Sequence, residues 1–135
     1  MIDTSILVDL LRKYPKTLNF IHQLGSKPLF ATEISIMELV FGVTGSKVYT
    51  NNPELKQKRL SEIQDLTIKF TILSFDRKSA YKTAEMMGKL KLDGNIIDFR
   101  DGMIAGITKA NGIDELLTHN KNHFERISEL NVIEI

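Results

Sequence analysis

Short apolar segments that predict β-strands alternate along the whole chain with longer segments that predict α-helices. The expected strands are Met1–Ile2, Leu29–Ala31, Phe70–Phe75, Glu115–Thr118 and Val132–Ile135. Strands separated by helices are typical of a parallel sheet, because parallel neighbours need a long crossover connection. The order therefore predicts the α/β class, with a central parallel sheet covered by helices on both faces. No linker, low-complexity tract or internal repeat divides residues 1–135, so we expect a single domain.

Start and stop signals bound the helices expected between these strands. They run from Asp3 to Leu11, Pro15 to Leu24, Thr32 to Val43, Asn52 to Leu66, Asp76 to Leu92 and Asp98 to Ala110. Asp3 or Thr4, Asn52 and Asp76 stand at helix starts, where a side-chain oxygen can accept hydrogen bonds from free backbone N–H groups. A brief helix or an irregular connection is expected through Phe124.

The composition limits the kinds of site and compartment that the chain can have. Its net charge of +1 is too small to predict nucleic-acid binding, so a polyanion would have to meet a local basic patch. The absence of cysteine excludes disulfides, zinc–thiolate sites and cysteine nucleophiles. No leader-like segment opens the chain, and no apolar run approaches the roughly 20 residues that span a bilayer. We therefore expect a cytoplasmic protein without a membrane partner.

Three carboxylates stand in or beside apolar runs, where an ionised side chain is costly to bury without a cation or hydrogen-bond donors. Asp3 follows the first expected strand, Glu38 lies in an apolar stretch between Ile34 and Phe41, and Asp101 precedes a run of small apolar residues. In parallel α/β folds, ligands collect at the carboxyl ends of the strands. The pattern therefore favours a carboxylate metal site that contains Asp3, Glu38 and Asp101.

Each carboxylate also has a purely structural interpretation. Taken alone, Asp3 is more often a helix cap, and Glu38 could face solvent or form a buried ion pair, although a functional role is favoured for Glu38. Asp98 and Asp101 both lie in the first turn of a helix, where negative charge suits the helix dipole, so spacing does not separate them. Of the other acids, Asp9 is assigned to the surface, Asp76 to a helix cap and Asp114 to a turn.

A polar cluster, Thr118-His119-Asn120 with Asn122 and His123, follows the fourth expected strand. Two histidines four residues apart suggest a transition metal, but only helical spacing would aim both rings at one ion, and this segment begins at a strand end. The other candidate ligands are hard oxygens, which favour Mg²⁺ or Mn²⁺. Thr118 and Asn120 could hydrogen-bond a carboxylate, or they could be ordinary loop residues.

Taken in order, these signals resemble the PIN-domain nucleases, and most closely the VapC-type toxins of prokaryotic toxin–antitoxin systems. The segments that resemble the family's successive motifs are Ile2-Asp3-Thr4-Ser5-Ile6-Leu7, Ile36-Met37-Glu38-Leu39, Asp101-Gly102-Met103-Ile104-Ala105-Gly106, and Leu117-Thr118-His119-Asn120 with His123-Phe124-Glu125-Arg126-Ile127. The resemblance covers the entire chain.

The resemblance implies an endoribonuclease that depends on Mg²⁺ or Mn²⁺ and hydrolyses RNA phosphodiester bonds. Asp3, Glu38 and Asp101 would be catalytic, with Asp3 and Asp101 as metal ligands. The implied accessory residues are Thr4, Ser5, Asp98, Thr118 and Asn120. The family often has a fourth acidic residue in its closing region, where this chain has Asn120 and His123. Three explanations stay open: the fourth metal ligand is neutral, Asp98 takes the place of the missing acid, or the metal affinity is reduced.

The resemblance also implies three partners: an RNA substrate, a VapB-type antitoxin, and a second copy of the chain in a homodimer. Two apolar stripes could form contact surfaces or simply face the core, one with Leu55, Leu60 and Ile63 and the other with Phe20, Ile21 and Leu24. The lysines that could guide RNA are Lys13, Lys47, Lys89 and Lys91. Two other functions stay open, a non-catalytic RNA-binding or protein-binding module and a phosphohydrolase of small substrates.

Overall fold

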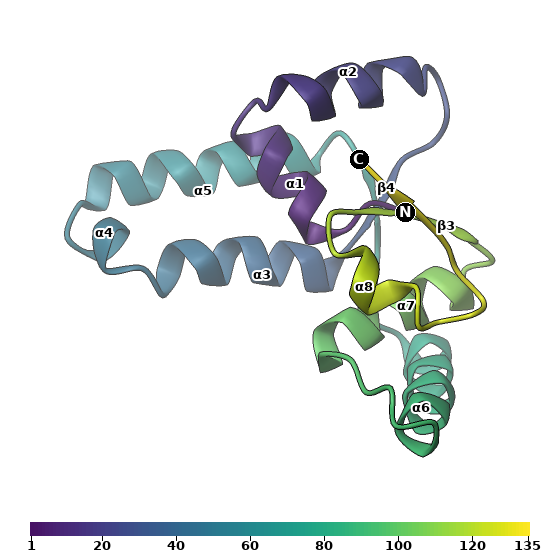
Figure 1. Cartoon of the computed structure of the whole chain (residues 1–135). Helices are drawn as coiled ribbons and strands as arrows, with labels where there is room; N and C mark the ends of the chain where they lie inside the picture. Colours follow the sequence, from purple (N-terminus) through teal and green to yellow (C-terminus); the bar gives the residue numbers. More distant parts are fainter.

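The computed structural model describes all 135 residues (Figure 1), and its four strands form two parallel pairs. Strand β1 (Phe30–Thr32) pairs with β2 (Thr71–Leu73), and β3 (Glu115–Thr118) pairs with β4 (Asn131–Glu134), both in parallel. Residues 1–3 join the two pairs. The N–H of Ile2 donates a hydrogen bond to the carbonyl of Phe30 at 2.8 Å, and the N–H of Leu117 donates one to the carbonyl of Met1 at 2.9 Å. The strand order is therefore β2, β1, residues 1–3, β3, β4.

Eight helices accompany the strands. They are α1 (Thr4–Leu11), α2 (Pro15–Gln23), α3 (Glu33–Thr44), α4 (Lys47–Thr50), α5 (Pro53–Thr67), α6 (Arg77–Leu92), α7 (Phe99–Ala110) and α8 (Lys121–Phe124). The predicted order of elements is confirmed, except that the first predicted strand, Met1–Ile2, is only an isolated parallel bridge between Ile2 and Leu117. Strand β2 is shorter than the predicted segment, and the short helix α4 has no counterpart in the sequence analysis. No helix has both the length and the apolar character needed to cross a bilayer.

Side-chain caps start several of the helices. Asn52 accepts a hydrogen bond from the backbone of α5 at 3.0 Å, and Asp76 accepts one from the backbone of α6 at 2.8 Å, as predicted. Asp3 occupies the cap position of α1, but its side chain makes no capping hydrogen bond. The predicted helix start at Asp3 is therefore confirmed, but the expected side-chain cap is absent, and the Asp3 carboxylate has other partners.

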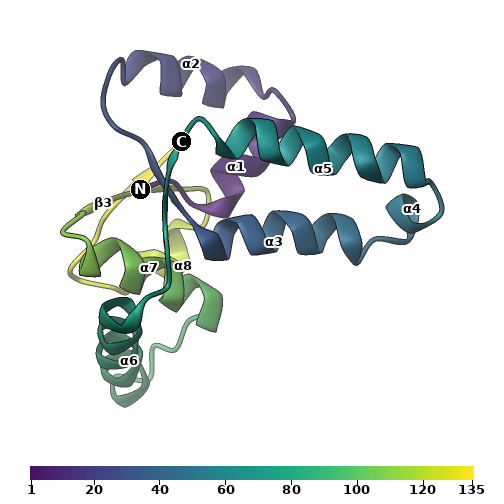
Figure 2. The same cartoon turned by 180° about the vertical axis from the view of Figure 1, so that it is seen from behind.

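The sheet is covered on both faces, as predicted. Met1 and Leu116 belong to one apolar core, whereas their chain neighbours Ile2 and Leu117 belong to a second. This division follows from the strand geometry, which points successive side chains to opposite faces. Helices α6 and α7 contribute to the first core, and α1, α3 and α5 contribute to the second. In both views, α3 and α5 lie side by side with α4 at the tip, forming an arm that projects from the sheet (Figures 1 and 2).

Two glycines allow α7 to pack closely against α6. A Cβ atom built on Gly106 would lie 1.9 Å from the Oγ1 atom of Thr83 and 2.9 Å from its Cα atom. A Cβ atom built on Gly102 would lie 2.4 Å from the sulfur of Met87. The backbones therefore approach more closely than a side chain at these positions would permit. This contact fixes the position of α7, whose first turn carries Asp101.

Candidate metal centre

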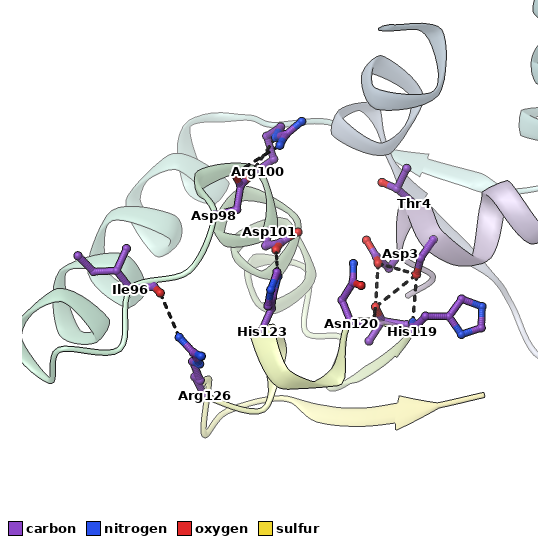
Figure 3. Close-up of polar contacts among 12 residues, drawn as sticks. Asp3, Thr4, Ile96, Asp98, Arg100, Asp101, His119, Asn120, His123 and Arg126 are labelled. Carbon is purple, nitrogen blue, oxygen red and sulfur yellow. Dashed lines mark hydrogen bonds and ion pairs between the residues drawn. The ribbon is translucent and has the colours of Figure 1, made fainter. Parts of the chain in front are cut away.

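The predicted site residues come from four separate segments of the chain. Asp3 ends the first strand segment, Thr118 ends β3, Asp101 lies in the first turn of α7, and Glu38 lies in the middle of α3. Residues 1–3 run parallel to β3, which brings Asp3 and Thr118 together at the carboxyl edge of the sheet (Figure 3). This edge is where the sequence analysis placed the site.

Asp3 is buried, and hydroxyl groups hold its side chain. Its side chain is only 2% exposed, and its Oδ2 atom accepts hydrogen bonds from Ser5 Oγ at 2.9 Å and Thr118 Oγ1 at 2.8 Å. Ser5 Oγ in turn accepts a hydrogen bond from the backbone N–H of His119 at 3.1 Å. These contacts fix the orientation of the carboxylate and assign partners to only one of its two oxygens.

Glu38 reaches the site from α3 and is mostly buried. Thr4 Oγ1 donates to its Oε2 atom at 2.5 Å, and Arg100 Nη1 lies 3.3 Å from its Oε1 atom. Burial raises the pKa of Glu38, and the nearby charges of Asp3 and Asp101 raise it further, against the opposing effects of Thr4 and Arg100. The ion pair that the sequence analysis considered for Glu38 is present, and it lies beside the other two carboxylates.

Asp101 faces the segment that follows β3. The Nδ1 atom of His123 lies 2.7 Å from Asp101 Oδ2, as Figure 3 shows. Burial raises the pKa of Asp101, and the charge of Asp3 adds to this rise, whereas the contact with His123 opposes it. His123 therefore stands against one of the predicted metal ligands, in the region where the family often has an acidic residue.

Asp98 differs from Asp101 in its surroundings, although spacing alone did not separate them. Its Oδ1 atom accepts hydrogen bonds from the Arg100 backbone N–H at 2.9 Å and from Arg100 Nε at 3.0 Å, and its side chain is about half exposed. The side-chain contact with Arg100 is the main cause that holds the pKa of Asp98 below its usual value. Asp98 is thus engaged in capping α7 and in binding Arg100.

Asn120, which follows β3, lies between Asp3 and His123. Its backbone N–H donates to Thr118 Oγ1 at 2.9 Å, and its side chain points into the space between Asp3 and His123 (Figure 3). An amide in this position can donate to a carboxylate or accept from a bound group. Its placement fits the accessory role that the resemblance implies.

A second acid–histidine contact was missed by the sequence analysis. Asp9, which had been assigned to the surface, has a side chain that is only 17% exposed. Its Oδ2 atom accepts a hydrogen bond from Thr17 Oγ1 at 2.6 Å and lies 2.8 Å from His119 Nε2. Burial alone would raise the pKa of Asp9, but these two partners outweigh it and lower the pKa. No local sequence signal links Asp9 to His119, because they are separated by 110 positions.

The two histidines consequently serve different carboxylates. His119 binds Asp9 and points away from Asp101, whereas His123 binds Asp101 (Figure 3). The rings do not converge on one position, in keeping with the sequence argument against a two-histidine transition-metal site.

The donor set fits a hard divalent cation. Asp3, Glu38 and Asp101 experience one another's charge, because the pKa of Glu38 is raised by both aspartates. A cation would offset this repulsion, and carboxylate oxygens are ligands that Mg²⁺ and Mn²⁺ accept. However, no three acidic or histidine side chains form a ready-made metal cluster in the structure. Glu38 is instead paired with Arg100, and Asp101 is paired with His123 through its Oδ2 atom.

Comparison with known proteins identifies relatives over nearly the whole chain. A family model described as PIN domain matches residues 1–130. A relative from Shigella flexneri, named tRNA(fMet)-specific endonuclease VapC, is 24% identical over 130 residues, which cover 96% of this chain and 92% of the relative. Ribonuclease VapC2 from Haemophilus influenzae is 26% identical over 131 residues, with coverage of 96% and 92%.

Solved structures with a similar fold span the same length. One is VapBC2 from Rickettsia felis bound to a DNA fragment from its promoter, with a TM-score of 0.86, 26% identity and coverage of 100% of this chain and 97% of the other. Another is VapBC-1 from nontypeable Haemophilus influenzae, with a TM-score of 0.81, 26% identity and coverage of 99% and 96%. The match therefore includes the arm and both sides of the sheet.

Proposed function

This chain belongs to the PIN-domain family, and on that basis we propose that it is a divalent-metal-dependent endoribonuclease, the toxin of a toxin–antitoxin pair. The observation that carries the proposal is the grouping of Asp3, Glu38 and Asp101 from three separate elements, with burial and mutual charge raising the pKa of the last two. Carboxylates whose pKa values are raised by burial and by one another's charge are typical of functional sites. The names of the VapC relatives support RNA as the substrate.

In this proposal, Asp3 and Asp101 hold the cation. When bound, Mg²⁺ or Mn²⁺ supplies positive charge at the phosphodiester and lowers the pKa of the attacking water. Ser5 and Thr118 orient Asp3 through the hydrogen bonds to its Oδ2 atom, and His123 orients Asp101. Such hydrogen-bond partners fix the orientation of a ligand oxygen, and metal affinity depends on this orientation.

Glu38 is the carboxylate left to accept the proton of the attacking water. Its raised pKa brings it closer to neutral pH, which suits a general base. Thr4 holds one oxygen of Glu38 in place, so the second oxygen would face the reacting water once Arg100 has moved. The reaction needs no protein nucleophile, in agreement with a chain that lacks cysteine and any nucleophile elbow.

The test of this function is cleavage of RNA by the purified protein in Mn²⁺ and in Mg²⁺. We expect internal cuts in unpaired RNA, because single strands fit an open carboxylate site better than a deep A-form groove does, and complete loss of cutting in EDTA. Mononucleotides and sugar phosphates are assayed in parallel. Hydrolysis of these small substrates without RNA cleavage would support the phosphohydrolase alternative, and RNA binding without cleavage would support the non-catalytic module.

An apolar hollow beside the site is the proposed binding site of the antitoxin, called the antitoxin seat below. It has a volume of about 250 Å³ and extends from Glu38 between α1, α3 and α5 to Arg12 and Arg59. Its apolar lining includes Val8, Leu11, Leu39, Val43, Tyr49 and Ile63. The charged lining of this hollow thus consists of one carboxylate and two arginines, of which Arg59 is paired with Glu62 at 2.7 Å. The complementary partner is an amphipathic segment with a basic residue near Glu38 and an acidic residue near the arginines.

The two apolar stripes considered in the sequence analysis are mostly engaged elsewhere. Phe20, Ile21 and Leu24 pack against the second core, as does Leu60. Ile63 is buried, and it is the residue of these stripes that also lines the hollow. The proposed antitoxin seat is thus defined by α1 and α3 as much as by α5.

Filling the hollow should block antitoxin binding without unfolding the protein. Gly42 of α3 lines the hollow, and a Cβ atom built on it meets no atom within 4 Å. Gly42→Leu should therefore fold, since leucine is the better helix former, while its side chain occupies the seat. We expect at least a tenfold loss of affinity for the VapB-type antitoxin, measured by calorimetry. Gly88→Leu on α6, where space is also open, is the control and should bind normally.

The exposed end of α3 supports the homodimer. Met37 and Phe41 lie one helical turn apart, are 49% and 67% exposed, and line a hollow with Arg100. Phe99, the neighbour of Arg100 in sequence, is also exposed. Exposed apolar side chains that gather in this way mark interaction surfaces, and a second copy of the chain would bury them.

A charge at Phe41 should therefore give a monomer. We expect Phe41→Asp to sediment at half the mass of the wild type in analytical ultracentrifugation, because a buried unpaired carboxylate at an interface is costly. Leu92→Asp is the control, since Leu92 is as exposed but lies at the far end of α6. A wild-type protein that is monomeric at high concentration would rule the dimer out.

A further inference from the structure

Arg100 places a fixed positive charge within the candidate metal centre. Its Nη1 atom lies 3.3 Å from Glu38 Oε1, while its Nε and Nη2 atoms lie 3.0 and 3.4 Å from the two oxygens of Asp98. Arg100 therefore bridges α3 and the start of α7. Its side chain is half exposed, so it can leave Glu38 without passing through the core.

Asp98 determines where the guanidinium lies. The fork of Arg100 meets both oxygens of Asp98, a geometry that restricts the position of the charge more than a single contact would. Because Asp98 also caps α7 through the Arg100 backbone N–H, the position of this carboxylate is itself fixed. The positive charge is consequently held at the edge of the carboxylate group even when Glu38 has another partner.

A divalent cation held by Asp3 and Asp101 and the guanidinium of Arg100 would compensate the charge of the same carboxylate group. The charge of Arg100 opposes the effect of burial on the pKa of Glu38, so it provides part of the compensation that a metal ion would provide. A cation that binds Asp3 and Asp101 meets the repulsion of the nearby guanidinium, which Asp98 holds in place. Arg100 should therefore weaken metal binding while keeping Glu38 charged and in place.

We propose that Arg100 is a built-in electrostatic competitor of the divalent cation that Asp3 and Asp101 would hold: its guanidinium pairs with the neighbouring Glu38 in the metal-free protein, and its positive charge lowers the metal affinity of the site. This inference rests on the proposed metal-dependent function. A purely structural role is a poor explanation, because the cap of α7 uses the backbone of Arg100 and an exposed ion pair contributes little to stability.

The test is to measure Mn²⁺ binding to the purified full-length protein. Binding is measured by calorimetry and by the electron paramagnetic resonance signal of free Mn²⁺. We expect Arg100→Gln to bind Mn²⁺ about tenfold more tightly than the wild type, because one repelling charge has been removed. Arg100→Lys keeps the charge and should stay within about threefold of the wild type. Arg126→Gln removes an equal charge that faces the Ile96 carbonyl instead of a carboxylate, and it should bind like the wild type.

The outcomes separate the two proposals. Equal or weaker Mn²⁺ binding by Arg100→Gln, with a wild type that does bind, overturns the role of Arg100 and leaves the metal site standing. The same is true if Arg100→Lys binds as tightly as Arg100→Gln, because charge would then not be the cause. A wild type that binds no Mn²⁺ overturns the metal-dependent function itself. Loss of a structural contact alone would weaken binding, so the expected gain in affinity is specific to competition.

Discussion

Replacement of Asp101 by asparagine should reduce RNA cleavage by about a thousandfold or more while leaving the fold intact. Asparagine has the shape of aspartate but lacks its charge, so the variant loses a proposed metal ligand and the cation that it would hold. The amide oxygen can still accept a hydrogen bond from His123, which lies 2.7 Å from the carboxylate in the wild type. The measurement is kcat/KM on an unpaired RNA in saturating Mn²⁺.

The same substitution should not lower stability. Burial raises the pKa of Asp101 in the folded protein, so the folded state disfavours its charged form relative to the unfolded chain. At pH values above that raised pKa, the charge of Asp101 costs stability, and the neutral asparagine removes the cost. We expect the melting temperature of Asp101→Asn in EDTA to equal or exceed that of the wild type. Loss of activity together with retained stability would locate the effect in the site.

Asp114→Asn is the matched control for this experiment. Asp114 is exposed and pairs with Lys109 next to the end of α7, whereas Asp101 lies in the first turn of that helix. The control variant should cleave RNA at the wild-type rate. If Asp101→Asn cleaves as well as Asp114→Asn, the nuclease mechanism proposed above is wrong.

Gly106→Ala should be the most destabilising small substitution that we consider. The new Cβ atom would lie 1.9 Å from Thr83 Oγ1 and 2.9 Å from the Cα and Cβ atoms of Thr83. Rotation of the threonine side chain cannot relieve the contact with Cα, so the backbones of α6 and α7 must separate. Overpacking of this kind costs about 3 kcal/mol, which corresponds to a fall of about 10 °C in melting temperature for a domain of this size.

Gly88→Ala separates this packing effect from the general effect of replacing a helical glycine. Gly88 lies in α6, and a Cβ atom built on it meets nothing within 4 Å. Alanine should therefore stabilise the protein by about 0.5–1 kcal/mol, because it restricts the unfolded chain and favours the helix. Both variants are measured by thermal and urea denaturation. A Gly106→Ala protein as stable as Gly88→Ala would show that α7 is not held against α6 as described.

Activity should follow this packing as well. The contact between α6 and α7 positions the first turn of α7, which contains Asp98, Arg100 and Asp101. In Gly106→Ala, a shift of that turn by even about 1 Å would separate Asp101 from the other carboxylates and reduce cleavage at temperatures well below melting. Gly88→Ala should leave cleavage unchanged.

Much of the fold could be predicted from local patterns. The apolar segments predicted the strands, and their alternation with helices predicted the parallel sheet and its two covered faces. The caps at Asn52 and Asp76 were predicted because a cap depends on a side chain and a backbone N–H only three residues away. The cap at Asp3 was wrong for the same reason, because local rules omit partners from elsewhere in the chain.

The composition of the candidate site could also be predicted, but its contacts could not. Sequence analysis selected Asp3, Glu38 and Asp101 because burying a charge among apolar residues costs free energy. This cost can be judged from the residues that are neighbours in sequence. It did not find Arg100 as the partner of Glu38, and it placed Asp9 on the surface although His119 and Thr17 bind it. Each of these contacts joins different elements of the fold.

The sequence by itself determined which segments form strands and helices and which acids need compensation, because these properties depend on residues within a few positions of one another. Only the tertiary structure decided how the charges are compensated. Thr118 donates to Asp3 across 115 positions because residues 1–3 and β3 are neighbours in the sheet. Arg100 reaches Glu38 because α7 packs beside α3. Hydrogen bonds and ion pairs act over a few ångströms, so they depend on distances that chain folding sets and that sequence separation does not reveal.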